Sequence, residues 1–127
     1  MTNEEMARKH FELGNDYFGK GNNVQAIVEL NKAIEYGSSN PNLVMAILGS
    51  LGYAYKFNEE YDKAITYLTK FIEMSPNVRA VIDRGKTYYL NGDINKAIAD
   101  FEIVLQAEPS NDEAKTLLNE IKKQRGF

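Results

Sequence analysis

The residues in this sequence with the most potential for chemistry are one histidine and three pairs of neighbouring acids. His10 is the only histidine, and the acidic pairs are Glu4–Glu5, Glu59–Glu60 and Asp112–Glu113. Paired carboxylates could act as general acid and base. However, the sequence has no partner motif for the histidine, no glycine-rich phosphate loop, no metal-ligand spacing and no cysteine. We therefore expect no catalytic residue, no metal, no cofactor and no enzymatic activity.

The helices expected around these residues explain them without chemistry. Each acidic pair falls in the first turn of an expected helix, where negative charge interacts favourably with the helix dipole. His10 falls at a core position of a repeating helical pattern, which favours a packed residue over a ligand. We therefore interpret both features as structural.

Three glycines mark the repeat, namely Gly14, Gly52 and Gly85. Each is followed three residues later by tyrosine and twelve residues later by an alanine and an isoleucine. The steps are 52 − 14 = 38 and 85 − 52 = 33 residues, which are lengths typical of stacked helical units. Small and apolar residues at spacings of three and four predict two amphipathic helices per unit. Turn-forming segments at 19–23, 57–59 and 91–93 should make the paired helices antiparallel.

Capping residues predict where the helices begin. Thr2 with Glu5 forms a capping box, and Asn40–Pro41 and Ser75–Pro76 each place a cap before proline. Ser110 with Glu113 predicts a further capping box, which opens a last helix with an apolar stripe. The extra residues of the first step fall near 36–42, so the first helix of the second unit should begin early and be longer by about one turn.

The pattern resembles the tetratricopeptide repeat, whose signature is W-x2-L-G-x2-Y, then A-x3-F, then P. The second unit matches it at Leu48, Leu51, Gly52, Tyr55, Ala64, Leu68 and Pro76. Ser38, Phe71 and Arg84 depart from it, replacing a proline, an alanine and a leucine. The resemblance implies an all-α superhelix of three helical hairpins plus a C-terminal capping helix. It implies a single domain over 1–127, with repeats at about 3–40, 41–75 and 76–109 and the capping helix at 110–125.

In this family the first helices of successive repeats line a concave groove that takes a peptide or a helix of another protein. The resemblance therefore implies a non-catalytic scaffold or adaptor. The groove positions carried over from the family are Arg8, Phe11, Asn15, Phe18, Ser50, Tyr53, Lys56, Arg79, Ile82, Asp83, Lys86 and Tyr89. Aromatic side chains beside Arg and Lys have the composition of binding hot spots, although Phe18 and Tyr89 could equally pack against neighbouring helices.

Some members of the family hold the acidic C-terminus of a chaperone with a clamp of lysine, arginine and asparagine residues. The matching positions here are Phe11, Asn15, Ser50, Arg79 and Asp83. Asn15 and Arg79 suit the clamp, but two cations are missing and Asp83 should repel a carboxylate. On this basis we expect no binding of a chaperone tail.

Charge and composition narrow the remaining classes of partner. The net charge is −3 and the pI is about 5.2, so neither nucleic acid nor a membrane surface is expected as a partner. The start of the chain is polar, and no stretch is apolar enough to span a membrane, which favours a cytoplasmic location. An alternative function remains open, namely a structural subunit that self-associates through its repeat ends or outer face.

Overall fold

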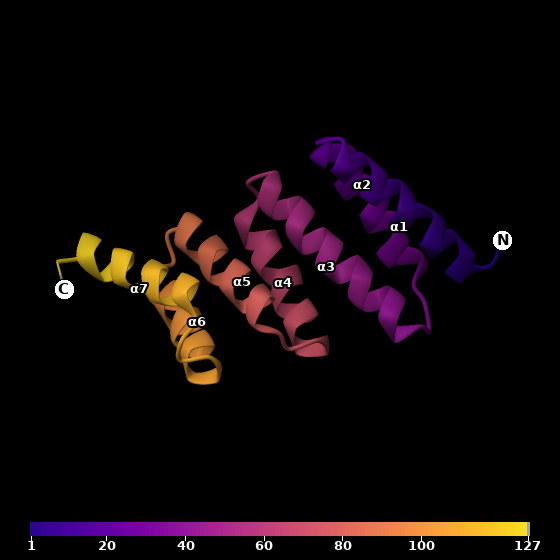
Figure 1. Ribbon diagram of the computed structural model, residues 1–127. Helices are drawn as coiled ribbons and strands as arrows, with labels where there is room; N and C mark the ends of the chain where they lie inside the picture. The colour runs from indigo at the N-terminus through magenta and orange to yellow at the C-terminus, as the bar shows by residue number, and fades with distance from the viewer. Residues whose placement is uncertain (127) are drawn as a thin grey trace. The chain divides into compact units, whose positions relative to one another are not determined.

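The computed structural model describes residues 1–126, which contain seven helices and no strand (Figure 1). This confirms the expected all-α fold of three helical hairpins followed by a last helix. The helices are α1 (Asn3–Gly19), α2 (Asn23–Tyr36), α3 (Pro41–Phe57), α4 (Tyr61–Met74), α5 (Val78–Leu90), α6 (Ile94–Ala107) and α7 (Asp112–Gln124).

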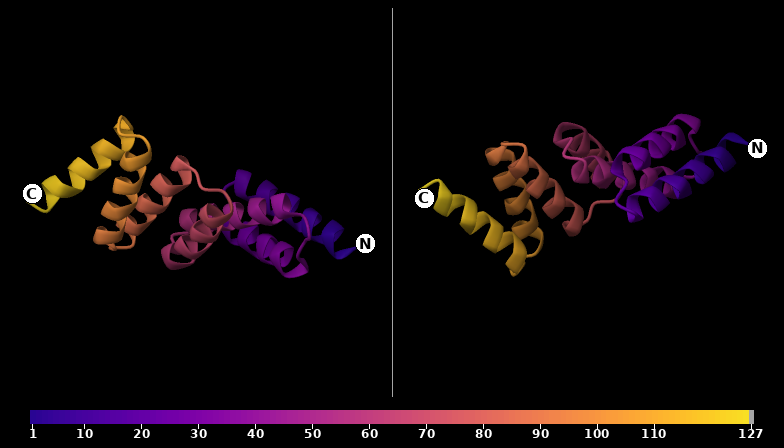
Figure 2. Two further views of the ribbon diagram at one scale, coloured as in Figure 1. Left: turned by 90° about the horizontal axis from the view of Figure 1, so that it is seen from below. Right: turned by 90° about the horizontal axis from the view of Figure 1, so that it is seen from above.

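The chain divides into two compact units, of which the first is Met1–Ser75 and the second begins at Pro76. In the first unit α1 packs on α2, α3 packs on α4, and α2 also packs on α3. In the second unit α6 packs on both α5 and α7, so the last helix covers the third hairpin as expected. Figure 2 shows these pairings from two further directions. The single domain over 1–127 stays a prediction.

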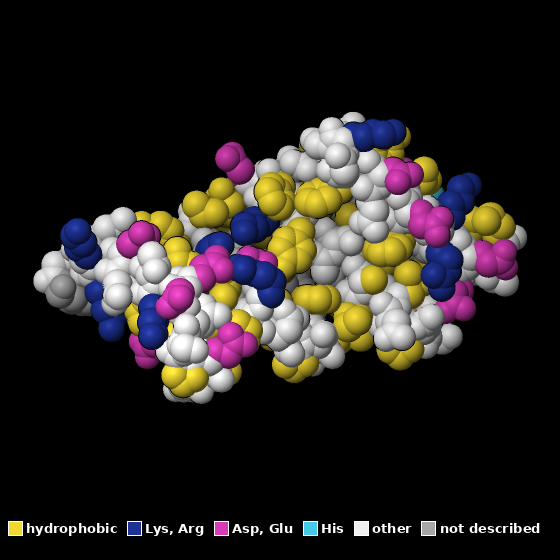
Figure 3. Space-filling view, in the orientation of Figure 1, with side chains coloured by type: hydrophobic (Ala, Val, Ile, Leu, Met, Phe, Trp, Pro, Cys, Tyr) yellow, Lys and Arg dark blue, Asp and Glu magenta, His cyan; other side chains and the backbone are white. Residues whose placement is uncertain are grey.

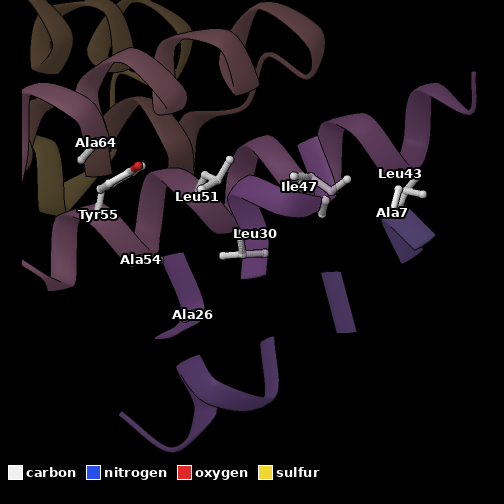
Figure 4. Close-up of a cluster of buried hydrophobic side chains, with 10 residues drawn as sticks. Ala7, Ala26, Leu30, Leu43, Ile47, Leu51, Ala54, Tyr55 and Ala64 are labelled. Atoms are coloured by element: carbon white, nitrogen blue, oxygen red, sulfur yellow. The ribbon is translucent and has the colours of Figure 1, made fainter. Parts of the chain in front are cut away.

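The core of the first unit combines alanines of α1 and α2 with larger branched side chains of α2 and α3. Leu30 of α2 and Ile47 and Leu51 of α3 are fully buried (Figure 4). Ala7 and Ala26 are buried in the same cluster. The alanines let the helices approach closely enough for the branched side chains to fill the space between them.

The three signature glycines are required by a larger side chain on the second helix of each hairpin. A Cβ atom at Gly14 would lie 2.7 Å from Leu30 Cγ, and one at Gly85 would lie 2.7 Å from Phe101 Cε1. At Gly52 the corresponding atom is Leu68 Cδ2, at 2.9 Å. The glycines therefore serve close helix packing, as the sequence predicted, through the leucine or phenylalanine that follows each repeated alanine by four residues.

The turns inside the three hairpins share one backbone conformation. The carbonyl of the signature tyrosine accepts a hydrogen bond from the backbone N–H five residues later, at Asn22, Glu60 and Asp93. The residue before that donor has a positive φ in all three turns, and it is Gly21, Glu59 and Gly92. Positive φ favours glycine. The first and third turns have glycine at this position, whereas the middle turn has Glu59.

Two of the predicted helix starts are confirmed and two are wrong. Thr2 and Glu5 form the capping box, and Pro41 is the first residue of α3, capped by Asn40. In contrast, Asn77 caps α5 in place of Ser75, because its side chain accepts a hydrogen bond from the Ala80 N–H at 2.8 Å. Asn111 likewise caps α7 in place of Ser110.

Two departures from the family signature are compensated by contacts within their hairpins. Arg84 donates from Nε and Nη2 to the two carboxylate oxygens of Asp100, at 2.8 and 2.6 Å. Phe71 lies over Gly49, where a Cβ would be 3.1 Å from the ring. In addition, α3 has 17 residues against 13 in α5, which agrees with the longer helix expected, although α1 also has 17.

Candidate functional site

The residues predicted to line a groove lie on α1 and α3 of the first unit and on α5 of the second. These are the first helices of the three hairpins, the elements that the repeat pattern assigns to the inner face. A groove that continues across all three repeats stays a prediction, and the two units are described separately below.

In the first unit the aromatic candidates are partly structural. Phe11 and Phe18 are half-buried and pack against the hydrophobic core. Phe18 also meets Phe57 edge to face, with ring centroids 5.6 Å apart, and the Lys56 ammonium lies 5.9 Å from the Phe57 ring centroid. Arg8 is exposed. Each aromatic ring therefore stabilises the hairpins while leaving part of its surface accessible.

The polar candidates of the first unit are half-buried. Asn15 lies on α1, and Ser50 and Tyr53 lie on α3. Their side chains could donate hydrogen bonds to the backbone carbonyls of an extended peptide. α1 and α3 also contact each other directly, so these polar groups belong to neighbouring helices of the same unit.

Two α5 candidates have structural roles. Ile82 is only 2% exposed, so its assignment to the groove lining is corrected: the side chain is part of the buried core. Tyr89 is 36% exposed, and its hydroxyl donates a hydrogen bond to Gln124 Oε1 of α7 at 2.6 Å. Tyr89 thus helps to seat the last helix.

The other α5 candidates form a charged cluster with α7. Arg79 donates from Nη1 and Nη2 to Oε2 and Oε1 of Glu113, at 2.8 and 3.1 Å. Lys86 Nζ lies 2.6 Å from Glu113 Oε1. Arg79 Nη2 also donates to Asp83 Oδ1 at 3.1 Å. One carboxylate is therefore held by two cations, one of which is shared with a second carboxylate.

The cluster changes the acidity of its members. Hydrogen bonds from Arg79 and then Lys86 lower the pKa of Glu113 to about 2. The hydrogen bond to Glu113 likewise raises the pKa of Arg79 above its usual value. Figure 3 shows dark blue and magenta side chains beside one another where α5 and α7 lie. This part of the second unit is thus a carboxylate-binding arrangement, and its carboxylate comes from the same chain.

The cluster of Arg79, Lys86 and Glu113 was missed as a unit by the sequence reasoning. Arg79 and Lys86 are seven residues apart, two helical turns, and this spacing places them on one face of α5. That signal was available from the sequence. Glu113 is 34 residues from Arg79 and was assigned to a capping box, so only the packing of α7 brings the carboxylate to these cations.

His10 is a packed residue with a polar partner. Its Nδ1 lies 2.6 Å from Glu29 Oε2, and its ring stacks on Tyr36 with centroids 5.5 Å apart. No group of three or more metal-ligating side chains occurs in residues 1–126. Over the same residues, no helix combines the length and apolar character needed to cross a bilayer.

The pattern of hairpins, glycines and turns is matched by a family model. The model described as the tetratricopeptide repeat matches residues 46–78 and 78–111, together just over half of the chain. The chain belongs to the tetratricopeptide repeat (TPR) family. The first hairpin lies outside the two matches, although its glycine, tyrosine and alanine follow the same pattern.

Relatives of this TPR chain include a longer enzyme and two peptide-bound domains. Mouse peptidyl-prolyl cis-trans isomerase FKBP4 is 33% identical over 119 residues, covering 84% of this chain and 26% of the relative. The chain thus spans about a quarter of that relative. The second TPR domain of human RPAP3, in complex with the HSP70 peptide SGPTIEEVD, is 29% identical with a TM-score of 0.74, covering 94% of this chain and 98% of that one.

The first TPR of Spaghetti (RPAP3), bound to the HSP90 peptide SRMEEVD, has a TM-score of 0.76. The match covers 99% of this chain and 98% of that one. The two sequences are 24% identical, so this likeness concerns the fold.

These findings correct the expectation that a chaperone tail would not be a partner. That expectation is wrong, because the second TPR domain of human RPAP3, which matches nearly the whole of this chain, was solved with an HSP70 peptide. The sequence argument counted cations only at the clamp positions. Lys86 lies outside those positions yet contacts the same carboxylate as Arg79, and Asp83 is paired with Arg79 and does not stand as an isolated repelling charge.

Proposed function

We propose that this TPR chain is a non-catalytic adaptor that binds the acidic C-terminal segment of a partner protein, of the kind carried by HSP70. The observation that carries the proposal is the likeness to a domain in complex with the peptide SGPTIEEVD, at 29% identity and with nearly complete coverage of both chains. That peptide ends in two glutamates, a valine and an aspartate, so a complementary surface needs cations and hydrogen-bond donors.

The inner helices carry such groups in both units. Arg8 lies on α1, Lys56 on α3, and Arg79 and Lys86 on α5. Asn15 and Tyr53 supply side-chain donors, and the half-buried faces of Phe11 and Phe18 supply apolar contact. Within each unit the cations suit charge-assisted hydrogen bonds to the acids of an extended peptide, and in the first unit the aromatic rings add apolar contact.

Titration calorimetry with the peptide SGPTIEEVD tests the proposal. We expect saturable binding of this peptide and none of a control in which glutamine and asparagine replace the acids and the C-terminus is amidated. Equal binding of both peptides would show that the acids are not recognised. Absence of saturable heat from either peptide would refute the proposal.

A matched pair of charge reversals tests which surface binds. Tyr53→Ala combined with Arg79→Glu removes an aromatic contact and reverses one charge on the inner helices, so this variant should lose most of the affinity. Tyr53→Ala with Lys115→Glu carries the same change of net charge on the exposed side of α7. It should lose only the Tyr53 contribution. A similar loss in both variants would argue against the α5 surface.

A further inference from the structure

The Glu113 carboxylate already has the contacts that a bound ligand carboxylate would need. Arg79 binds both of its oxygens in a two-pronged arrangement, and Lys86 adds a third contact. Two-pronged pairing between arginine and a carboxylate is the strong geometry of this interaction. The two cations of α5 are therefore occupied by an acid of α7.

Glu113 is not the residue that caps its own helix. Asn111 caps α7, and its Oδ1 accepts the hydrogen bond from the Ala114 N–H at 2.9 Å. The helix is seated by the buried side chains of Ala114, Leu118 and Ile121 and by the Tyr89–Gln124 hydrogen bond. Loss of the Glu113 contacts therefore leaves α7 capped and packed.

From this arrangement we infer that Glu113 is an internal competitor, which holds Arg79 and Lys86 until a carboxylate of an acidic peptide displaces it. The inference rests on the proposed function, because it names how that same surface is regulated. Arg79, Lys86, Asp83 and Glu113 together carry no net charge, so an incoming acid meets a neutralised surface while Glu113 stays in place.

The exposure of the cluster makes the displacement feasible. The side chains of Arg79, Lys86 and Glu113 are 54%, 35% and 37% exposed, so water screens these pairs and each is individually weak. The measured affinity for a peptide carboxylate is proportional to the fraction of molecules in which Arg79 and Lys86 are not paired with Glu113. Removing the competing charge should therefore tighten binding by about three- to tenfold.

The decisive variant is Glu113→Gln, with Asp112→Asn as its matched control. Asp112 lies in the same first turn of α7, so both variants remove one negative charge from the same place. Titration of SGPTIEEVD should show tighter binding to Glu113→Gln than to wild type, and little change for Asp112→Asn. Adding Arg79→Gln to Glu113→Gln should abolish the gain.

A second probe separates this inference from the proposed function. N-acetyl-Val-Asp, a short dicarboxylate, is titrated while the Arg79 Nε–H and Lys86 side-chain resonances are followed by NMR. We expect a saturable shift in Glu113→Gln and a smaller one in wild type.

The possible outcomes are distinct. If the long peptide binds equally to wild type, Glu113→Gln and Asp112→Asn, the inference is wrong and the proposed function stands. A second outcome is that the long peptide binds neither wild type nor Glu113→Gln, whereas the short probe shifts the Arg79 resonance in Glu113→Gln alone. The role of Glu113 as a competitor is then supported, and the proposed partner is wrong. If neither probe acts, both ideas fail.

Discussion

Arg84 occupies a position where the family signature has leucine, and its guanidinium forms a nearly buried ion pair with Asp100. The two side chains are 16% and 4% exposed. Nε and Nη2 of Arg84 each donate to one carboxylate oxygen of Asp100. Removing either side chain therefore leaves the charge of the other poorly solvated. Arg84 thus brings a charge to a position where the signature has leucine, and Asp100 neutralises it.

A double-mutant cycle tests this coupling. Asp100→Ala alone should lower the free energy of unfolding by about 2–4 kcal/mol, because it leaves Arg84 without its counter-charge. The double variant Arg84→Leu with Asp100→Ala removes both charges and gives position 84 the leucine of the signature, so it should fall within about 1 kcal/mol of wild type. Urea unfolding measures both values. Additive losses in the double variant would contradict the coupling.

Glu113 makes a pH-dependent contribution to stability. Its pKa is lowered to about 2 in the folded chain, against an ordinary value of 4.5. A lowered pKa stabilises the folded state above the ordinary value, and this contribution disappears as the pH falls from about 4.5 to about 2. Because the pair is exposed and screened, we expect a contribution of about 0.5–1 kcal/mol.

Comparison of wild type with Glu113→Gln by thermal unfolding checks this expectation. Wild type should be the more stable protein at neutral pH, and the two curves should converge as the pH approaches 2. A difference that grows on acidification would contradict the direction of the pKa change.

At the scale of elements, the three turns provide an internal comparison. Glu59 has a φ of 62°, whereas the equivalent residues Gly21 and Gly92 have φ values of 79° and 85°. Side chains other than glycine are strained in this conformation. Glu59→Gly should therefore stabilise the second hairpin by about 0.5–1 kcal/mol.

The reverse change at Gly92 is the control. A Cβ there would meet no atom within 4 Å, so Gly92→Ala should destabilise the chain through backbone strain alone, by about 1 kcal/mol. Chemical denaturation measures both variants. Opposite signs are the expected result, and a destabilising Glu59→Gly would show that the glutamate side chain has a stabilising role of its own.

The packing of each hairpin depends on the missing side chain at its signature glycine. Gly85→Ala places a methyl group against the Phe101 ring, at 2.7 Å in the unrelaxed structure, and should destabilise the third hairpin by about 1–3 kcal/mol. Gly19→Ala adds a methyl group in open space at the end of α1 and should be close to neutral. Amide hydrogen exchange in α5 and α6 would localise the effect.

The sequence predicted these elements well because their signals are local. Gly52, Tyr55 and Ala64 define a hairpin by spacing alone, and the turn after Phe57 follows from its residue types. Helix starts were less secure, since Ser75 and Ser110 compete with Asn77 and Asn111 a residue or two further on. The contacts of Glu113 and the burial of Ile82 could not be predicted, because both depend on how helices distant in sequence pack.

At the scale of the whole molecule, charge sets the kinetics of the proposed binding. The chain carries a net charge of −3 at pH 7, the same sign as an acidic peptide. The long-range field therefore opposes approach, while the contacts at Arg79 and Lys86 favour the bound state. The two effects belong to different steps, and salt screens both over a Debye length of about 8 Å at physiological ionic strength.

Stopped-flow measurement with SGPTIEEVD separates the steps. As ionic strength rises, we expect the association rate constant to increase modestly, by less than about threefold, and the dissociation rate constant to increase as well. An association rate constant that falls steeply with salt would reveal a steering positive surface and contradict this account.

The cap at Asn111 has a consequence for substitutions at position 113. Because Asn111 caps α7 without help from Glu113, a change at position 113 leaves the helix capped and costs only the modest stabilisation that comes from the contacts with Arg79 and Lys86. On the proposed function, a single substitution at position 113 therefore changes the affinity for an acidic peptide at little cost in stability.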